Sequence, residues 1–402
     1  MNRTISLIGT MAVAALLAMT TSCSSNDEGT QVVSLQVQVL LPQGFSGGGN
    51  AGQTVVLAKG AQTQTAVTND QGVATFEGVI PDVYDISTSW EITPDEYEAA
   101  TGLEVQNENY TLSGSLMKQT IAAPVSLTLQ TSAAVNQSLL ISKVYYAGSK
   151  DNNNKNYLAG KYIEFYNNSD KPVDVAGLYF GLVESNSTPA YMLNTTPDYL
   201  YLKQIFRFPA DKSTMVQPGG TLLVCNSAID HTAFAPNEKD LSKADFEAKD
   251  TKNTNNPNVP ALTRISTVFP TLLSMNLVQS GPCGIVLFRT TEDPTTWEEV
   301  YSDGKSSGTQ SIKMPIKYVM DGVEILKYAT TGVDTSVKRL YDYIDAGYIT
   351  NDATNGYNGK TVYRKIAKTT DDGRIVLQDT NNSSNDFALT DNIDLGKYVP
   401  ND

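Results

Sequence analysis

The stretch "LLISKVYYAGSKDNNNKNYLAGKYIEFYNNSDKPVDVAGLYFGLVES", residues 139–185, decides the fold of the larger part of this chain. Runs of aliphatic and aromatic residues alternate with segments rich in Asn, Asp, Ser and Gly, which is the pattern of short strands joined by turns. Ile163 and Phe165 lie two residues apart, so they share one face of a strand and are expected to be buried. Residues 168–170, Asn-Ser-Asp, are expected to form the turn that follows.

The same stretch resembles the opening of lamin-tail-like immunoglobulin sandwiches. The segment "FRFPADKSTMVQPGGTLLVCNSAIDH", residues 206–231, resembles the elements that come next in those domains. Lys143 departs from the pattern, because these domains usually carry Glu at that place. The resemblance implies one lamin-tail-like β-sandwich with insertions over residues 136–402.

The tail "TVYRKIAKTTDDGRIVLQDTNNSSNDF", residues 361–387, resembles the closing segment of extracellular lamin-tail-like domains. Arg364 and Asp386 are expected to be structural, because an arginine can bind an aspartate bidentately and lock this segment onto the sandwich. Asp379, Asn381 and Asp386 also offer the oxygen ligands that Ca²⁺ prefers. They lack the spacing of an EF-hand, and their amides suit turns equally well, so calcium is the one candidate cofactor.

The N-terminal part of the chain reads as a smaller domain over residues 32–132. In "VSLQVQVLLP", residues 33–42, apolar and polar residues alternate as in a half-buried strand. "TQTAVTNDQGVATFEGVIPDVYDISTSW", residues 63–90, resembles the transthyretin-like sandwiches of the carboxypeptidase-regulatory type. That resemblance makes Phe76 and Tyr84 core residues, and such modules act as spacers or docking units.

The first 22 residues have the features of a signal peptide: an arginine, an apolar run over residues 5–19, and small polar residues before Cys23. The arrangement resembles a bacterial lipoprotein signal, although Thr20 stands where Leu is usual. We expect acylation of Cys23, so that residues 23–31 form a lipid anchor and tether and the lipid bilayer is a partner. Acidic residues soon after Cys23 resemble the export signal of surface lipoproteins. The expected location is the outer membrane at the cell surface, with the periplasmic leaflet as the alternative.

Composition agrees with strands rather than helices. The chain has 402 residues, of which 40% are hydrophobic and only 18% are charged. We therefore expect an all-β protein with two tandem, immunoglobulin-like β-sandwich domains after the leader and few helices. The net charge of −14 would repel phosphates, so no nucleic-acid partner is expected. The 21 tyrosines fit strands that have one solvent-exposed face, or an aromatic surface on which a ligand could stack.

The remaining reactive residues leave alternatives open. Cys225 and Cys283 could form a disulfide in an oxidising compartment, or each could be a buried apolar thiol. His231 is the single histidine, and Asp230 beside it could orient its ring. We expect no enzyme, with a hydrolase that uses His231 or an unrecognised carboxylate pair as the alternative. The charged segment 233–258 is expected to form a short helix and then a loop, with its charges in solvent.

Taken together, the leader, the first sandwich and several later segments resemble one Bacteroidota family of predicted lipoproteins of unknown function. The later segments are "NSAIDHT" (226–232), "VFPTLLSMNLVQSGPCGIVLF" (268–288) and "LQDTNNSSNDF" (377–387). Members are usually encoded near TonB-dependent receptors. The resemblance implies a non-catalytic binding or accessory module that helps an outer-membrane β-barrel receptor to capture a nutrient. The alternative is a surface adhesin or structural protein that binds glycan or host matrix.

Overall fold

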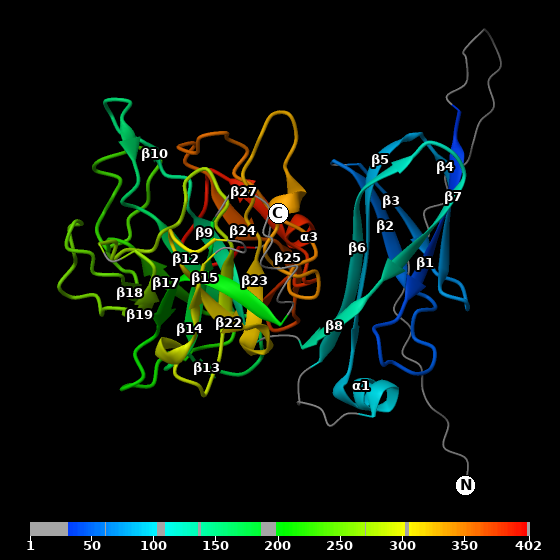
Figure 1. Cartoon of the computed structure of the whole chain (residues 1–402), viewed down its shortest axis with the longest axis horizontal. Coiled ribbons are helices and arrows are strands. Elements are labelled where there is room, and N and C mark those ends of the chain that lie inside the picture. Colours follow the sequence, from blue (N-terminus) through cyan, green and yellow to red (C-terminus); the bar gives the residue numbers. More distant parts are fainter. Residues whose placement is uncertain are drawn as a thin grey trace.

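The computed structural model describes residues 31–60, 62–102, 109–135, 138–185, 198–269, 271–301 and 305–399. The expected leader and the lipidation site Cys23 lie outside these residues. The described chain forms two β-sandwiches, one blue to cyan and one green to red in Figure 1. The prediction of an all-β protein with few helices is confirmed. The helices are α1 (Pro94–Thr101), α3 (Ser383–Asp386) and the 3₁₀ turns η1 (Pro294–Thr296), η2 (Ile316–Tyr318) and η3 (Thr335–Val337).

The first sandwich packs a three-stranded sheet, in the order β4-β1-β7, against a five-stranded sheet, in the order β3-β2-β5-β6-β8. Alternate residues of β1 and β5 meet the other strands in one apolar core, as the period-two pattern predicts. The strands are β1 (Val33–Leu40), β2 (Thr54–Lys59), β3 (Gln62–Val67), β4 (Val73–Val79), β5 (Asp82–Ile92), β6 (Tyr110–Ile121), β7 (Val125–Gln130) and β8 (Ser132–Val135).

Phe76 and Tyr84 lie in this first core, with 3% and 8% of their surfaces exposed. The Tyr84 hydroxyl donates to the carbonyl of Ile80 over 2.7 Å, so this polar group has a hydrogen-bond partner although the ring is buried. The turn between β3 and β4 places Gly72 at φ +75°, a conformation that favours glycine. A Cβ there would lie 2.3 Å from the side chain of Asn50, which belongs to the glycine-rich loop (residues 44–52) and donates to the Val39 carbonyl over 2.8 Å.

The second sandwich packs two larger sheets face to face. One runs β18-β17-β12-β9-β24-β27, and the other runs β21-β22-β15-β14-β20-β23, with β19 paired to β15. Aromatic and aliphatic residues of both sheets share one core. The strands of the first are β9 (Leu139–Tyr145), β12 (Tyr162–Asn167), β17 (Thr221–Cys225), β18 (Phe246–Glu247), β24 (Thr361–Arg364) and β27 (Phe387–Thr390).

The strands of the other large sheet are β14 (Tyr179–Val183), β15 (Tyr199–Arg207), β19 (Thr263–Thr267), β20 (Ile285–Phe288), β21 (Glu299–Val300), β22 (Ser311–Pro315) and β23 (Val319–Val323). Three short pairs complete the sandwich: β10 (Ser149–Lys150) with β11 (Asn156–Tyr157), β13 (Val173–Asp174) with β16 (Met215–Val216), and β25 (Ile366–Thr369) with β26 (Ile375–Leu377). Ile163 and Phe165 are fully buried, as expected.

The loop before β20 is held by side chains rather than by a β-ladder. Asn226 binds both backbone groups of Met275: its Oδ1 accepts from the amide over 2.7 Å and its Nδ2 donates to the carbonyl over 3.1 Å. Gln204 accepts from the Asn276 amide over 2.7 Å, and Lys161 donates to the Leu277 carbonyl. Buried backbone groups need such partners, so these side chains permit an irregular segment inside the sandwich.

The expectation for the charged segment 233–258 is wrong. The segment contains no helix, and several of its acidic groups are buried. Glu247 is fully buried and accepts from the amide of Ala228 over 2.7 Å. Asp250, 1% exposed, accepts from the amide of Ser274 over 3.0 Å. These carboxylates replace the missing backbone partners of neighbouring loops, which is why they do not face solvent.

The two sandwiches touch through β6 and the segments on either side of η3, and Figure 1 shows β6 on the side of the first sandwich that faces the second. Ser115 Oγ donates to the carbonyl of Ala346 over 3.3 Å. Lys118 Nζ donates to the carbonyl of Val333 over 2.8 Å. Direct side-chain contacts therefore join the domains in addition to the linker between β8 and β9.

Candidate functional site: an aromatic cleft on the second sandwich

Arg364 lies at the centre of a buried ion cluster, with 1% of its side chain exposed. Its Nη2 donates to both carboxylate oxygens of Asp321 over 3.0 Å. Its Nη1 donates to Asp379 Oδ1 over 2.9 Å and lies 3.6 Å from Asp386 Oδ2. The predicted partner Asp386 is therefore present, but Asp321, which the sequence analysis missed, is the partner that joins the two sheets. Arg364 is on β24 and Asp321 on β23.

The oxygens of the calcium candidates in the tail are engaged by other groups of the protein. Asp379 is paired with Arg364, and Asp386 accepts from the amide and hydroxyl of Thr380 over 2.8 and 2.7 Å. Asn381 contributes its backbone carbonyl, which accepts from the Ala346 amide over 2.6 Å. Within the described ranges, no group of His, Cys, Asp and Glu side chains is placed to hold a metal ion.

Lys143, the departure from the lamin-tail pattern, pairs with Glu164 over 2.6 Å, and both side chains are fully buried. The same ammonium donates to the carbonyls of Asp394 and Lys397, each over 2.9 Å. Glu164 Oε2 accepts from the Gly396 amide over 2.7 Å. The pair therefore clamps the C-terminal segment 394–398 across β9 and β12, and we call it the tail clamp.

His231 is buried, with both ring nitrogens in hydrogen bonds. Its Nε2 lies 2.8 Å from the carbonyl of Ser227, and its Nδ1 lies 2.6 Å from the hydroxyl of Tyr157. Since a carbonyl can only accept, Nε2 carries the proton and Nδ1 accepts from the tyrosine. Burial lowers the pKa of His231, which keeps the ring neutral. Asp230 does not orient it: this carboxylate accepts from Thr232.

The two cysteines are not joined, so the disulfide alternative is wrong. Both thiols are free and buried. Cys225 belongs to an apolar cluster behind β17, whereas Cys283 lies in the core between the two large sheets. Burial raises the pKa of Cys283 to about 12, so this thiol stays protonated at neutral pH.

An open cleft of about 640 Å³ lies where β15 and β22 meet η1 and η2. We call it the Trp297 cleft; its lining is Asp198, Tyr199, Glu292, Thr296, Trp297, Glu298, Lys313, Pro315, Ile316 and Lys317. Asp293 caps η1 by accepting from the Thr295 amide over 3.0 Å, and this turn sets the position of Trp297. Tyr199 lies opposite Pro315 in the β-ladder.

Hydrogen bonds and ion pairs fix the side chains around the Trp297 cleft. The Trp297 indole donates to Glu292 Oε2 over 2.9 Å, and the Tyr318 hydroxyl donates to the other oxygen. These two donors lower the pKa of Glu292, with Tyr318 the larger influence. Lys313 lies 3.2 Å from Glu298 and 4.5 Å from the centre of the Tyr199 ring. The cleft is therefore preorganised.

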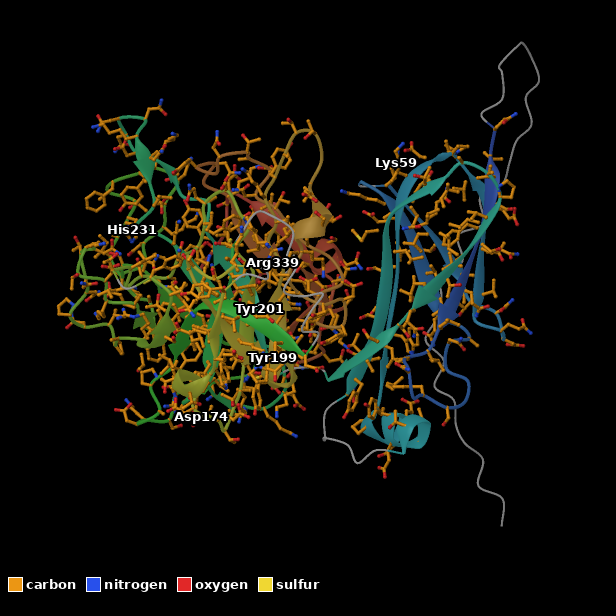
Figure 2. The ribbon with its side chains drawn as sticks, viewed as in Figure 1. Lys59, Asp174, Tyr199, Tyr201, His231 and Arg339 are labelled. Carbon is orange, nitrogen blue, oxygen red and sulfur yellow. The ribbon has the colours of Figure 1, made fainter. Side chains whose placement is uncertain are left out.

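Two further tyrosines extend the aromatic surface. Tyr341 and Tyr343 stack with centroids 5.7 Å apart and planes 8° apart, and Tyr343 is 41% exposed. Burial, and then Tyr341 and Asp198, raise the pKa of Tyr343 to about 12, and Tyr341 packs against the same apolar cluster as Trp297. Figure 2 shows Tyr199 and Tyr201 along β15, well apart from His231.

The first sandwich has a smaller pocket of about 290 Å³ between the glycine-rich loop, β5 and α1. Its lining is mostly apolar and includes Phe45, Trp90 and Ile92. Glu96 is the charged residue in it, and its carboxylate already accepts from the Thr93 amide over 2.7 Å as part of the cap of α1. This pocket thus offers few free groups to orient a ligand.

The fold and these sites define a class: a tandem β-sandwich protein with an aromatic cleft on its second domain. Residues 217–392 match the sequence family described as "Protein of unknown function (DUF4876)". The predicted resemblance to a family of unknown function is thereby confirmed. No curated protein is significantly similar to the chain. Within the described residues, no helix is long and apolar enough to cross a membrane.

Solved structures support the same fold. A DUF4876 family protein from Bacteroides thetaiotaomicron VPI-5482 has a TM-score of 0.57 at 22% identity, over 89% of this chain and 94% of that one. Fervidolysin from Fervidobacterium pennivorans, a keratinolytic enzyme related to subtilisin, has a TM-score of 0.19 at 13% identity, over 51% and 27% of the two chains. The first similarity shows the shared fold, and the second is too low to carry an argument.

Proposed function

We propose that this protein is a lipid-anchored, non-catalytic binding module of the outer membrane, and that it holds its ligand in the Trp297 cleft. The observation that carries the proposal is the construction of that cleft. Rings from β15 and from the segment after η1 border an open space, and hydrogen bonds to Glu292 fix the orientation of the indole. Fixed aromatic faces with convergent polar groups are typical of binding sites.

The other reactive groups have structural roles in the part of the chain that the structure describes. His231 is occupied on both nitrogens, and Cys283 has a pKa raised by burial. Arg364 and its carboxylates hold the sheets together. These arrangements favour binding over catalysis, because a general base needs a free lone pair near the substrate.

The proposed anchor is acylated Cys23, and the proposed partner is an outer-membrane β-barrel receptor that takes up the captured nutrient. Two or more acyl chains hold a protein stably on a bilayer, whereas one chain binds only marginally. The contacts between Ser115, Lys118 and the second sandwich support the role of the first domain as a spacer. It would hold the cleft at a defined position above the anchor.

The test is fractionation and co-purification of the detergent-solubilised protein from its native membrane. The full chain should fractionate with the outer membrane and bring down a stoichiometric β-barrel protein. The Cys23→Ala variant should be released into the soluble fraction. Membrane retention of that variant would refute the anchor. Attachment to host matrix without a barrel partner would favour the adhesin alternative.

A further inference from the structure

We propose that the Trp297 cleft binds a neutral oligosaccharide. The inference rests on the proposed binding function and deepens it by naming the chemical class of the ligand. Three properties of the cleft support it: the polarity of its ring faces, the presence of charges of both signs, and its size beside further aromatic rings.

The ring faces fit the apolar faces of sugar rings. An aromatic face carries partial negative charge, and it attracts the weakly positive C–H groups that a sugar ring presents on one side. Trp297 is half-buried. The centroid of its ring lies 5.8 Å from that of Phe288 and 6.2 Å from that of Tyr318, which is nearly parallel to it. The indole is therefore supported by the apolar cluster of the sandwich and still borders the cleft. A rigid, partly exposed indole is a suitable platform for a sugar.

The cleft carries charges of both signs side by side, which favours an uncharged ligand. Lys313 is shared between Glu298 and the Tyr199 ring, and Lys317 lies 4.9 Å from the centre of the Tyr318 ring. Three carboxylates and two ammonium groups line the space. A charged ligand would meet both signs, whereas hydroxyl groups can donate to the carboxylates and accept from the lysines.

The size of the site favours more than one sugar unit. The volume of about 640 Å³ lies within the range of roughly 300–1,000 Å³ that is usual for small-molecule sites. Trp297 and Tyr341 pack against the same apolar cluster, and Tyr341 stacks on the exposed Tyr343. A chain of sugars that crosses Trp297 could therefore continue towards this stacked pair.

The test measures binding of neutral oligosaccharides of varied linkage to the detergent-solubilised full chain, first on an array and then by calorimetry. The Trp297→Ala variant should lose about tenfold or more in affinity, as is usual when a central aromatic anchor is removed. The matched control is Trp90→Ala. The protein has only two tryptophans, and Trp90 lies in the first sandwich. That variant should bind as the unmodified protein does.

Tryptophan fluorescence supplies a second readout. The ligand should change the emission of the unmodified protein and of Trp90→Ala, but not that of Trp297→Ala. Glu298→Gln is the variant to use if Trp297→Ala does not fold, because the Glu298 side chain is 64% exposed. It should weaken binding several-fold while the melting temperature stays unchanged.

Several outcomes would overturn the inference. One is binding that neither Trp297→Ala nor Glu298→Gln weakens. Another is an array on which no neutral sugar binds, or a cleft that takes only peptides or acidic polysaccharides. The proposed receptor role fails separately: sugar binding without a co-purified barrel would refute the partner and leave this inference standing, and a co-purified barrel without sugar binding would do the reverse.

Discussion

At the scale of single residues, Arg364 shows what a short motif can and cannot predict. The closing motif predicts that it pairs with Asp386, and the two groups are 3.6 Å apart. The stronger contacts go to Asp321, whose carboxylate also accepts from the Ile141 amide over 2.6 Å. Asp321 lies in an ordinary strand without a recognisable pattern, so only the packing of the two sheets shows its role.

Asp321→Asn should destabilise the protein strongly. The substitution keeps the size of the side chain, but its NH2 group cannot accept and would face Arg364 and either the Ile141 or the Gly322 amide in a buried place. Loss of one member of a buried ion pair typically lowers the free energy of unfolding by about 3–5 kcal/mol. Urea unfolding followed by circular dichroism would measure the change.

The control for this prediction is Asp371→Asn, at an exposed turn. It should stay within about 0.5 kcal/mol of the unmodified protein, as surface changes usually do. A loss of less than about 1 kcal/mol in Asp321→Asn would contradict the assigned role, because Arg364 would then be held well enough by Asp379 and Asp386.

At the scale of elements, strands with a clear alternation were predictable and irregular segments were not. β1 follows from period two, because it buries alternate side chains against one core. β12 is buried on both faces, with Ile163 and Phe165 on the predicted face between the two large sheets. The segment 233–258 was misjudged since its acidic residues bind backbone amides of distant loops. Nothing in the local pattern of Glu247 or Asp250 reveals those partners.

The Trp297 cleft was missed for the same reason. The tyrosine content suggested a stacking surface, but not where it lies. Its rings and charges come from three segments: 198–199, 292–298 and 313–317. Pairing of β15 with β22 brings two of them together, and η1 folds the third beside them. The site is created by the register in which β15 and β22 pair, so no local sequence motif marks it.

Asn226→Ala should loosen the loop before β20. The alanine leaves the buried Met275 amide unsatisfied, whereas the Met275 carbonyl keeps the Leu277 amide as a donor over 3.0 Å. An unsatisfied buried group costs about 1–3 kcal/mol, so the free energy of unfolding should fall by about that amount. Hydrogen exchange should also become faster at the Met275 amide than at core amides of β12.

Asn153→Ala, in the exposed turn between β10 and β11, is the matched control for that change. It should alter neither stability nor exchange at Met275. If Asn226→Ala leaves the exchange rate of the Met275 amide unchanged, the loop is held by its apolar packing and not by these hydrogen bonds.

At the scale of the whole molecule, buried carboxylates are a recurrent feature of the second sandwich. Burial raises the pKa of Asp386 and of Glu324 to about 7, and that of Asp321 to about 6. Three carboxylates share the single guanidinium of Arg364. Charge balance therefore favours a proton on at least one of them near neutral pH.

This arrangement makes stability depend on pH in a direction opposite to the usual one for acidic groups. The folded pKa values exceed the unfolded values of about 3.9 for Asp and 4.3 for Glu, so the folded state binds protons more tightly. The contribution is complete below about pH 4 and is lost as pH rises through about 6 to 7. The free energy of unfolding should fall between pH 5 and pH 8, by up to about 1.4 kcal/mol per pH unit for each group.

Urea unfolding at pH 5, 6, 7 and 8 would measure this slope. Glu324→Gln should flatten it, because an amide does not titrate and still accepts from the Arg339 and Leu340 amides. A slope that rises with pH, or one that Glu324→Gln leaves unchanged, would mean that these carboxylates are ionised throughout the range.

The tail clamp has a consequence for the synthesis of the protein. Lys143 contacts the carbonyl of Asp394, which is 251 residues further along the chain. A chain that emerges from its N-terminal end forms β9 and β12 long before the residues that neutralise and cover this pair arrive. A prematurely terminated chain would keep Lys143 and Glu164 uncovered and its sheet open to proteases. Residues 394–397 are therefore needed to cover this buried pair.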